Sequence, residues 1–164
     1  MAKRVIVSKC LLGYRCRYDG RSCLDRELKK CLKEWEVVGV CPEEMGGLRG
    51  RRGPFQIKGK TREVILGKAK VVDRKGRDFT KEFLEGAFAT LKIAKSKGIK
   101  IAVLKSRSPS CSPDYIYDGS FKNKLVRGEG LTCFLLRREG IKVFTSDEFK
   151  RYIFSHKRGQ SRRG

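Results

Sequence analysis

Short apolar runs alternate with segments of helical periodicity along most of this chain, and this order limits the folds that it can adopt. Four apolar runs are typical of buried strands and lie within residues 4–9, 37–40, 99–104 and 141–144. Amphipathic segments lie between or after them, at residues 24–35, 80–97, 129–138 and 146–154. Strands that alternate with helices pair in parallel, because each helix carries the chain back to the starting edge of the sheet.

The sequence therefore predicts an α/β fold. We expect a single compact domain with a mostly parallel open sheet and helices on both faces, Rossmann-like or flavodoxin-like. A length of 164 residues suits one domain. Residues 55–57 and 64–72 are expected to add a small antiparallel β insert. We expect the domain to span residues 1–154, and residues 155–164 to form a basic, disordered tail.

The chain carries a large excess of cations. Its 40 Lys and Arg residues against 18 Asp and Glu residues give a formal net charge of +22. Heat-adapted surfaces raise both signs of charge together, so this surplus instead favours a polyanionic partner such as nucleic acid. A merely basic surface is the alternative interpretation.

The apolar segments are too short to span a membrane. No window approaches the ~20 apolar residues of a membrane span. The first nine residues contain an apolar run of only three, which is too short for a signal peptide. We therefore expect a cytoplasmic protein. Its seven cysteines then need an explanation other than disulfides, namely burial, metal ligation or catalysis.

Three of these cysteines follow predicted strands. Cys10 comes directly after the first, Cys41 after the second, and Cys111 lies in the loop after the third. Ligands of open α/β sheets bind beyond the carboxyl ends of the strands, so these thiols can meet in one crevice. Three thiolates suit a soft metal centre. A structural zinc ion would need a fourth ligand and usually short Cys-x₂₋₄-Cys pairs, which this sequence lacks.

A [4Fe–4S] cluster usually takes four cysteines, and three would leave one iron open to a sulfur of a substrate. Three buried, unrelated cysteines are the alternative. Cys31 and Cys133 lie on apolar helix faces, which predicts core positions. A rival set of ligands, Cys10, Cys16, Cys23 and Cys31, would pull Cys31 off its helix face.

Five ordered segments resemble the TudS-like thiouracil desulfurase family. They are VSKCLLG at 7–13, CRYDG at 16–20, VCPE at 40–43 with GGL at 46–48, LKSRSPSC at 104–111 and IYDGSF at 116–121. The resemblance covers residues 4–144. It differs at residues 49–54, where the family often has a Pro-rich run, at Gln56, where a Glu is frequent, and at Ser112, where Gly is usual.

The resemblance implies an α/β domain with an oxygen-sensitive [4Fe–4S] cluster on Cys10, Cys41 and Cys111. It also implies that a thiolated uracil, such as 2- or 4-thiouracil, binds the open iron through its sulfur and leaves as uracil. Related proteins act on 4-thiouridine in tRNA. Glu43 and Ser108 match residues that the family places in catalysis.

Cleavage of a C–S bond needs a group that activates water and a route for protons. Glu43 could deprotonate the water, because burial beside a cluster would raise its pKa towards a useful base. The alternative for Glu43 is a helix N-cap or a solvated carboxylate. Ser108 could relay a proton, or could be an ordinary turn serine before proline. The single histidine, His156, makes a Ser–His hydrolase or a histidine-rich metal site a poor interpretation.

Further residues are candidates for binding substrate or RNA. The substrate-binding candidates are Ser8, Lys105, Ser106, Arg107, Tyr117 and Asp118. Tyr18, Tyr117 and Phe55 could stack on a pyrimidine, although such rings more often pack in a core or at a rim. The RNA-binding candidates are Arg49, Arg51 and Arg52, an arginine group expected to be exposed to phosphates, with solvated charge as the alternative.

Two functions of different class remain open. The first is an iron–sulfur-dependent desulfurase that acts on thiouracil or on thiouridine, within tRNA or free. The second is a non-catalytic, basic RNA-binding module with structural or zinc-binding cysteines. RNA binding alone gives no reason for thiols at three strand ends beside a Glu, which favours the enzyme.

Overall fold

A parallel sheet forms the centre of the molecule. The computed structural model describes residues 3–161. The sheet contains β1 (Lys3–Ser8), β2 (Trp35–Val40), β5 (Ile101–Val103) and β8 (Lys142–Phe144), in the order β2-β1-β5-β8. All three pairings are parallel. This confirms the predicted α/β class.

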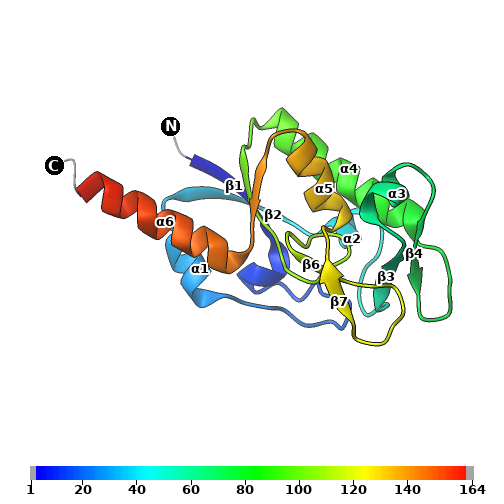
Figure 1. Cartoon of the computed structure of the whole chain (residues 1–164). Helices are drawn as coiled ribbons and strands as arrows, with labels where there is room; N and C mark the ends of the chain where they lie inside the picture. The colour runs from blue at the N-terminus through cyan, green and yellow to red at the C-terminus, as the bar shows by residue number, and fades with distance from the viewer. Residues whose placement is uncertain (1–2, 162–164) are drawn as a thin grey trace.

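Helices cover both faces of this sheet (Figure 1). The helices are α1 (Arg26–Cys31), α2 (Pro42–Met45), α3 (Thr61–Ile65), α4 (Thr80–Ser96), α5 (Leu131–Arg138) and α6 (Ser146–Ser161), with a short 3₁₀ helix, η1 (Lys9–Leu12). One face packs Ile6 and Ala102 against α4 and α5. The other packs Val5 and Val7 against α1 and α6. From Val5 to Ser8, the side chains of β1 are buried on both faces, as a central parallel strand requires.

Some helices begin or end at other residues than the sequence periodicity predicted. The reason is that apolar side chains used for the prediction are exposed or lie in a strand. The first helix was expected over residues 24–35, but Leu24 is exposed and Trp35 begins β2. Asp25 caps α1 instead, since its carboxylate accepts a hydrogen bond from the backbone N–H of Leu28 at 3.0 Å. On α4, Phe83 is buried, whereas Phe88 is 51% exposed.

Two small antiparallel pairs flank the main sheet. The predicted insert pairs β3 (Phe55–Lys58) with β4 (Lys70–Asp73). The expected strand at 64–72 was too long, because α3 and a turn occupy its first part; the Glu63 carboxylate accepts from the N–H of Lys60 and fixes the start of α3. The second pair, β6 (Tyr115–Tyr117) with β7 (Leu125–Arg127), was not predicted.

The last helix runs further than expected. α6 continues to Ser161, so residues 155–161 are helical where the sequence suggested a disordered tail, and residues 162–164 of that tail lie outside the described part. Contacts one turn apart support the extension, because the ring of His156 lies 4.1 Å from that of Tyr152. Thr145 caps this helix, since its hydroxyl accepts from the N–H of Glu148 at 3.1 Å.

Within residues 3–161, no helix has both the length and the apolar character needed to cross a membrane.

Candidate active site

A cavity of about 340 Å³ opens at the carboxyl edge of the sheet. Its lining includes the end of β1 at Ser8 and the end of β2 at Val40, together with the loop that follows β5. The chain leaves β1 for β2 on one side and later returns to β5 on the other. This reversal of strand order is the point at which open α/β sheets form a ligand crevice.

The structure brings the three strand-end cysteines to this one cavity. Cys10 lies in η1, Cys41 directly precedes α2, and Cys111 follows β5 in the loop. Cys10 and Cys111 are 7% and 5% exposed, and Cys41 is half-buried. Their positions follow from the parallel sheet, because the carboxyl ends of its strands share one edge.

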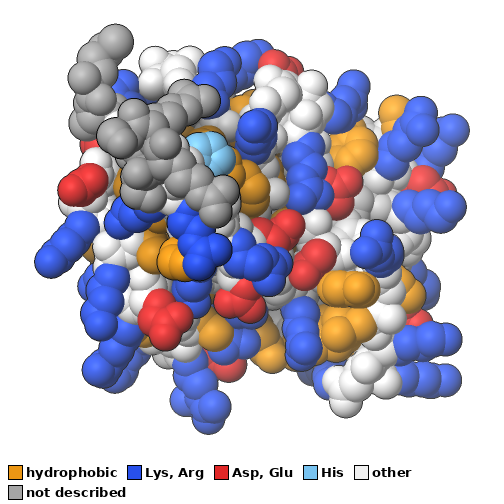
Figure 2. Space-filling view, turned by 60° about the vertical axis from the view of Figure 1, so that its left-hand side comes forward, with side chains coloured by type: hydrophobic (Ala, Val, Ile, Leu, Met, Phe, Trp, Pro, Cys, Tyr) orange, Lys and Arg blue, Asp and Glu red, His pale blue; other side chains and the backbone are white. Residues whose placement is uncertain are grey.

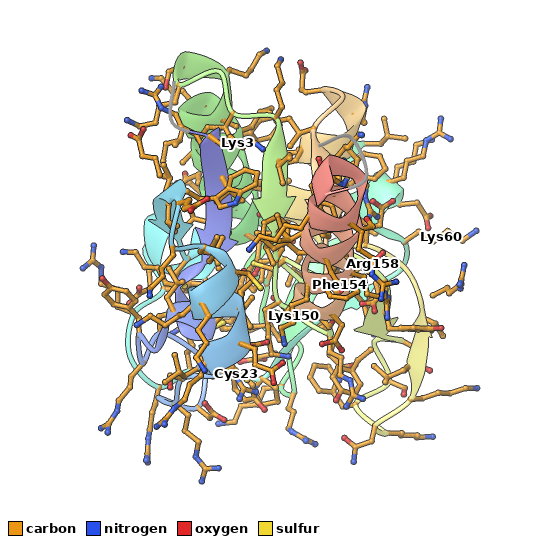
Figure 3. All side chains as sticks on the ribbon, turned by 90° about the vertical axis from the view of Figure 1, so that its left-hand side faces the viewer. Lys3, Cys23, Lys60, Lys150, Phe154 and Arg158 are labelled. Carbon is orange, nitrogen blue, oxygen red and sulfur yellow. The ribbon has the colours of Figure 1, made fainter. Side chains whose placement is uncertain are left out.

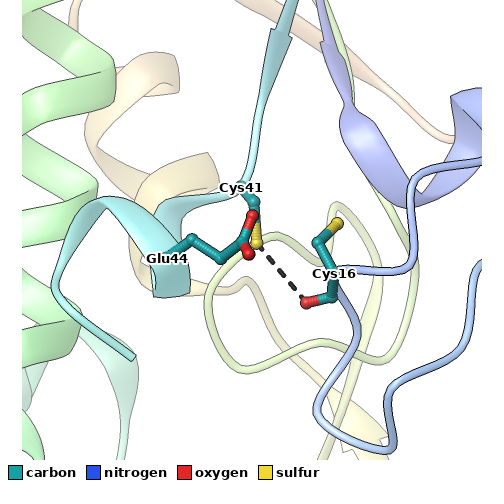
Figure 4. A group of neighbouring side chains, drawn as sticks. All are labelled: Cys16, Cys41 and Glu44. Carbon is teal, nitrogen blue, oxygen red and sulfur yellow. Dashed lines mark hydrogen bonds between the residues drawn. The ribbon is translucent and has the colours of Figure 1, made fainter. Parts of the chain in front are cut away.

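A fourth cysteine, Cys16, also lines the cavity. The sulfurs of Cys16 and Cys41 and a carboxylate oxygen of Glu44 lie within 4.8 Å of one another, and the Cys41 thiol donates to the Cys16 carbonyl at 3.7 Å (Figure 4). Of the rival ligand set, Cys10 and Cys16 line the cavity, whereas Cys23 and Cys31 do not. The spacing of the cysteines in the sequence did not distinguish Cys16, which lines the cavity, from Cys23 and Cys31, which do not.

The donors at the cavity comprise one tight group and three cysteines that form no such group. Ligands of one zinc ion lie about 2.3 Å from the metal, so their sulfurs must be close together. In the described residues, Cys16, Cys41 and Glu44 form the one group this tight. Cys10, Cys41 and Cys111 line the same cavity without forming a group this tight, and several thiols around one cavity are the ligand type that an iron–sulfur cluster takes.

The thiols need a cation to ionise in this environment. Burial raises the pKa of Cys111 to about 12, and hydrogen bonding to Cys10 raises that of Cys16 to about 12. The neighbouring Cys16 raises the pKa of Cys41 as well. A bound metal would supply the positive charge that stabilises the thiolates.

Glu43 lies beside these cysteines, in the first turn of α2. One carboxylate oxygen accepts from Arg52 Nε at 3.2 Å and the other from the Ser110 hydroxyl at 3.3 Å. Burial raises the pKa of Glu43, although Arg52 and Ser110 oppose the rise. The carboxylate is therefore neither a solvated group nor a side-chain N-cap of α2.

Arg52 does not occupy the exposed position expected for an RNA-binding residue. Its side chain is 8% exposed, and its guanidinium also donates to the carbonyls of Cys16 and Gly50. Arg49 and Arg51 are exposed, as expected, but do not line the cavity. Nothing in the sequence of this arginine run marks Arg52 as the inward-pointing residue. It differs from Arg49 and Arg51 by its contact with Glu43.

Two glycines fix α2, and hence Glu43, against α4. A Cβ atom on Gly86 would lie 1.8 Å from the Pro42 carbonyl oxygen, and one on Gly46 would lie 1.9 Å from that of Glu82. The two helices are thus in direct backbone contact. Side chains larger than hydrogen at these positions would displace the segment that carries Cys41 and Glu43.

The loop after β5 is organised by its own serines. The Ser108 hydroxyl accepts from the backbone N–H groups of Ser110 and Cys111 at 3.2 and 3.1 Å. It also lies 2.9 Å from the hydroxyl of Ser110, which contacts Glu43. Ser108 is therefore both a turn serine and the outer member of a hydroxyl chain to Glu43. Sequence reasoning missed Ser110, the inner member.

The remaining candidates divide between the cavity and other positions. Ser8 lines it and accepts from the N–H of Lys105 at 3.0 Å, which ties β1 to the loop after β5. Asp118 lies outside the lining and caps a turn through Ser120. The other predicted residues in the lining are Lys105, Ser106, Arg107, Tyr117, Tyr18 and Phe55. Lining residues that sequence reasoning missed include Arg17, Gln56, Arg74 and Asn123.

The fold and site define an α/β protein with a thiol-lined cavity suited to a soft metal centre. The chain belongs to the 2-thiouracil desulfurase family, whose model matches residues 5–148. This confirms the resemblance of the sequence motifs. A relative from Bacillus subtilis (strain 168), the uncharacterized protein YbbK, is 39% identical over 145 residues, which cover 88% of this chain and 96% of the relative.

A solved structure agrees with this assignment. The [4Fe–4S]-dependent thiouracil desulfidase TudS superposes with a TM-score of 0.82 at 38% identity, covering 94% of this chain and 98% of the other. The similarity therefore extends over nearly the whole of both chains.

Proposed function

We propose that this protein is an iron–sulfur-dependent desulfurase that removes sulfur from a thiolated uracil. The observation that carries the proposal is the meeting of Cys10, Cys41 and Cys111 with the buried carboxylate of Glu43 in one cavity. Membership of the 2-thiouracil desulfurase family and the similarity to TudS support it.

Cys10, Cys41 and Cys111 would hold a [4Fe–4S] cluster. Such a cluster would supply a soft Lewis acid for the sulfur of the substrate, because three protein ligands leave one iron free. Cys16 would stand beside the cluster as a thiol, close to Cys41. The buried walls around Cys10 and Cys111 would shield this centre from solvent.

Glu43 would act as the general base in a hydrolytic exchange. Its carboxylate would take a proton from water, whose oxygen bonds to the thiocarbonyl carbon as the C–S bond breaks. Uracil and hydrogen sulfide result, with no net oxidation or reduction. Arg52 holds the carboxylate in place, and the hydroxyls of Ser110 and Ser108 give protons a route along the loop.

The charges around the cavity support a substrate that carries phosphate. Its lining contains five cations: Lys9, Arg17, Arg74, Lys105 and Arg107. In the described part of the chain, none of the five forms a salt bridge with an acid, whereas Arg52 does. Figure 2 shows Lys and Arg side chains spread over one face of the molecule. We therefore propose thiouridine within tRNA as the substrate, in preference to a free base. We also propose a cytoplasmic location, where tRNA would be available.

The test uses protein purified without oxygen. Iron and acid-labile sulfide would be quantified, and sulfide release measured with 2-thiouracil, 4-thiouracil, thiouridine monophosphate and thiolated tRNA. We expect about four irons and four sulfides per chain and release from at least one compound, fastest from tRNA.

The same experiment tests the competing RNA-binding function. Protein that contains one zinc ion, no iron and no sulfide-releasing activity, but binds RNA, would contradict the enzymatic proposal. Cys16, Cys41 and Glu44 would then be the ligands to examine, because they are close enough together for a single ion.

A further inference from the structure

Cys16, Cys41 and Glu44 form a compact group of metal-binding side chains beside the cavity. The two sulfurs and a carboxylate oxygen of Glu44 lie within 4.8 Å of one another. Cys16 comes from the loop between η1 and α1, whereas Cys41 and Glu44 come from the start of α2 (Figure 4). Both cysteines line the cavity. The proposed cluster uses only Cys41 of these three, which leaves the approach of the other two unexplained.

Helix α2 places Cys41 and Glu44 on one side. Cys41 is the N-cap residue, and Glu44 follows three residues later in the first turn. Side chains at this spacing are neighbours on the surface of a helix. Glu43 points elsewhere, because Arg52 and Ser110 hold its carboxylate. The two consecutive acidic residues therefore face different groups.

The loop that carries Cys16 is fixed against this end of α2. The Arg52 guanidinium donates to the Cys16 carbonyl at 2.9 Å, and the backbone N–H of Arg52 donates to the Tyr18 carbonyl at 2.8 Å. The Cys41 thiol also donates to the Cys16 carbonyl, at 3.7 Å. These contacts join separate segments of the chain, so the approach of the two thiols is built into the fold.

The Glu44 carboxylate has no partner in the part of the chain that the structure describes. Neither a hydrogen bond nor a salt bridge engages it there. Glu44 is half-buried, so its carboxylate gives up part of its hydration without gaining a protein donor. A cation held between this carboxylate and the two thiols would be its partner.

The ligand types and their spacing suit one zinc ion. Zinc takes cysteine sulfur together with carboxylate oxygen, whereas magnesium and calcium take oxygen alone and copper(I) favours sulfur. Two sulfurs on a tetrahedral zinc ion lie about 3.8 Å apart, because each Zn–S bond is about 2.3 Å long. The three atoms are already within 4.8 Å, so small side-chain rotations would complete the set. Water from the cavity would take the fourth position.

We propose that Cys16, Cys41 and Glu44 form a zinc site that fills when the cluster is absent and that keeps the cluster out while zinc is bound. The two metal centres exclude each other because both need the Cys41 sulfur. Zinc is then an inhibitor of cluster loading. The zinc site rests on the geometry of the three side chains, and the exclusion also rests on the proposed function, which assigns Cys41 to the cluster.

Zinc affinity is measured on the whole chain without its cluster. Protein stripped anaerobically with a chelator is titrated with zinc against a chromophoric competitor. Cobalt(II) then replaces zinc as a spectroscopic probe, because its charge-transfer absorbance reports the sulfurs bound to it. We expect the natural protein to bind one metal ion, and the cobalt absorbance to fall in Cys16→Ser. Circular dichroism checks that each variant is folded.

Four variants separate this site from the cluster ligands. Cys16→Ser should weaken zinc binding by at least about a hundredfold and Glu44→Gln by about tenfold, while both still load iron. Cys111→Ser should behave in the opposite way, losing the cluster and keeping zinc. Cys41→Ser should lose both. Glu34→Gln, at an exposed carboxylate in the turn after α1, is the matched control for Glu44→Gln.

Exclusion is measured by rebuilding the cluster from iron and sulfide after one equivalent of zinc has been added. We expect zinc to slow cluster formation in the natural protein, a chelator to restore it, and zinc to have no effect on Cys16→Ser. The proposal is overturned if Cys16→Ser and Glu44→Gln bind zinc as tightly as the natural protein, if Cys111→Ser loses zinc as well, or if one chain holds zinc and a full cluster together.

The outcome for the proposed function is read separately. If the natural protein never loads a cluster, the proposed function fails, and the zinc affinities of Cys16→Ser and Cys41→Ser still decide whether the zinc site exists. Should Cys16→Ser not fold, Glu44→Gln against Glu34→Gln decides it.

Discussion

Arg52 and Glu43 form a buried ion pair at the wall of the cysteine-lined cavity. The distance from Arg52 Nε to Glu43 Oε1 is 3.2 Å, and the two side chains are 8% and 14% exposed. The same guanidinium donates to the Cys16 carbonyl at 2.9 Å. Arg52 thus connects the proposed base to the loop that carries the fourth cysteine.

Replacing Arg52 with Met should impair turnover more than binding. The Glu43 carboxylate would lose its buried counter-charge, and we expect kcat to fall by roughly tenfold or more, with a smaller change in KM. Removing one member of a buried pair should also lower the free energy of unfolding by about 3 kcal/mol. Arg51→Met, at the exposed neighbour, is the control for both measurements. Unchanged kcat with normal iron content would show that Arg52 does not position the base.

The cysteines should separate into ligands and neighbours. Serine at Cys10, Cys41 or Cys111 should each abolish cluster binding, because the hydroxyl is a poor ligand for iron. Cys16→Ser should retain iron, and the measurement is iron and acid-labile sulfide per chain after anaerobic purification. Cys31→Ser, at the end of α1 and outside the cavity lining, is the control for iron lost during purification. Loss of iron from Cys16→Ser alone, with the other three loaded, would refute the proposed ligand set.

The contact between α2 and α4 predicts a large effect from one methyl group. Gly86→Ala places a Cβ atom 1.8 Å from the Pro42 carbonyl oxygen, so α2 must move and carry Glu43 with it. We expect the free energy of unfolding to fall by about 1–3 kcal/mol, together with a loss of activity. Gly159→Ala is the matched control, because that helical glycine meets no neighbour and alanine favours helix there. Equal stability of the two variants in urea denaturation would contradict the close packing seen here.

Asp25 should make the stability of the protein depend on pH. Burial opposes its ionisation, but hydrogen bonds from Lys150, Ser146 and the N–H of Leu28 outweigh burial and lower its pKa from the ordinary value of 3.8. Lys150 projects from α6 (Figure 3), and its Nζ lies 2.8 Å from the Asp25 carboxylate, so the pair joins α1 to α6.

A lowered pKa in the folded state means that the ionised Asp25 stabilises the fold above pH 3.8, and that this contribution is lost as the pH falls through the folded-state value. Asp25→Ala should therefore cost about 1 kcal/mol at neutral pH, the usual effect of losing an N-cap. The difference from the natural protein should narrow below pH 3.8. Glu27→Ala, at an 81% exposed carboxylate, serves for comparison. A difference that does not change with pH would show that Asp25 acts without its charge.

RNA binding should depend on the exposed arginines near the cavity and on salt. The double variant Arg49→Ala/Arg51→Ala should weaken binding of tRNA and reduce the slope of log affinity against log salt by roughly one to two. Lys100→Ala/Lys142→Ala removes two exposed cations at the opposite edge of the sheet and should change little. Fluorescence anisotropy at several salt concentrations measures the affinity for tRNA and its salt dependence. Equal effects of the two double variants would show that RNA binding depends on net charge and not on the position of the arginines.

Local patterns were sufficient for the main elements of the fold. The β1, β2, β5 and β8 strands are apolar runs whose periodicity is visible without any partner. The β6–β7 pair was missed because its strands form no buried apolar run: of their six residues, Ile116 alone is buried. The α6 helix was cut short because its last turns contact little besides each other, so a basic composition was mistaken for disorder.

The candidate site likewise has a part that the sequence predicted and a part that only the structure showed. The sequence by itself determined that Cys10, Cys41 and Cys111 follow strands, and parallel strands end at one edge, so their approach followed from chain order alone. Only the tertiary structure decided that Arg52 turns inward to Glu43 and that Cys16 approaches Cys41. The physical reason is that both orientations depend on hydrogen bonds between separate segments of the chain, which leave no periodic trace in either segment.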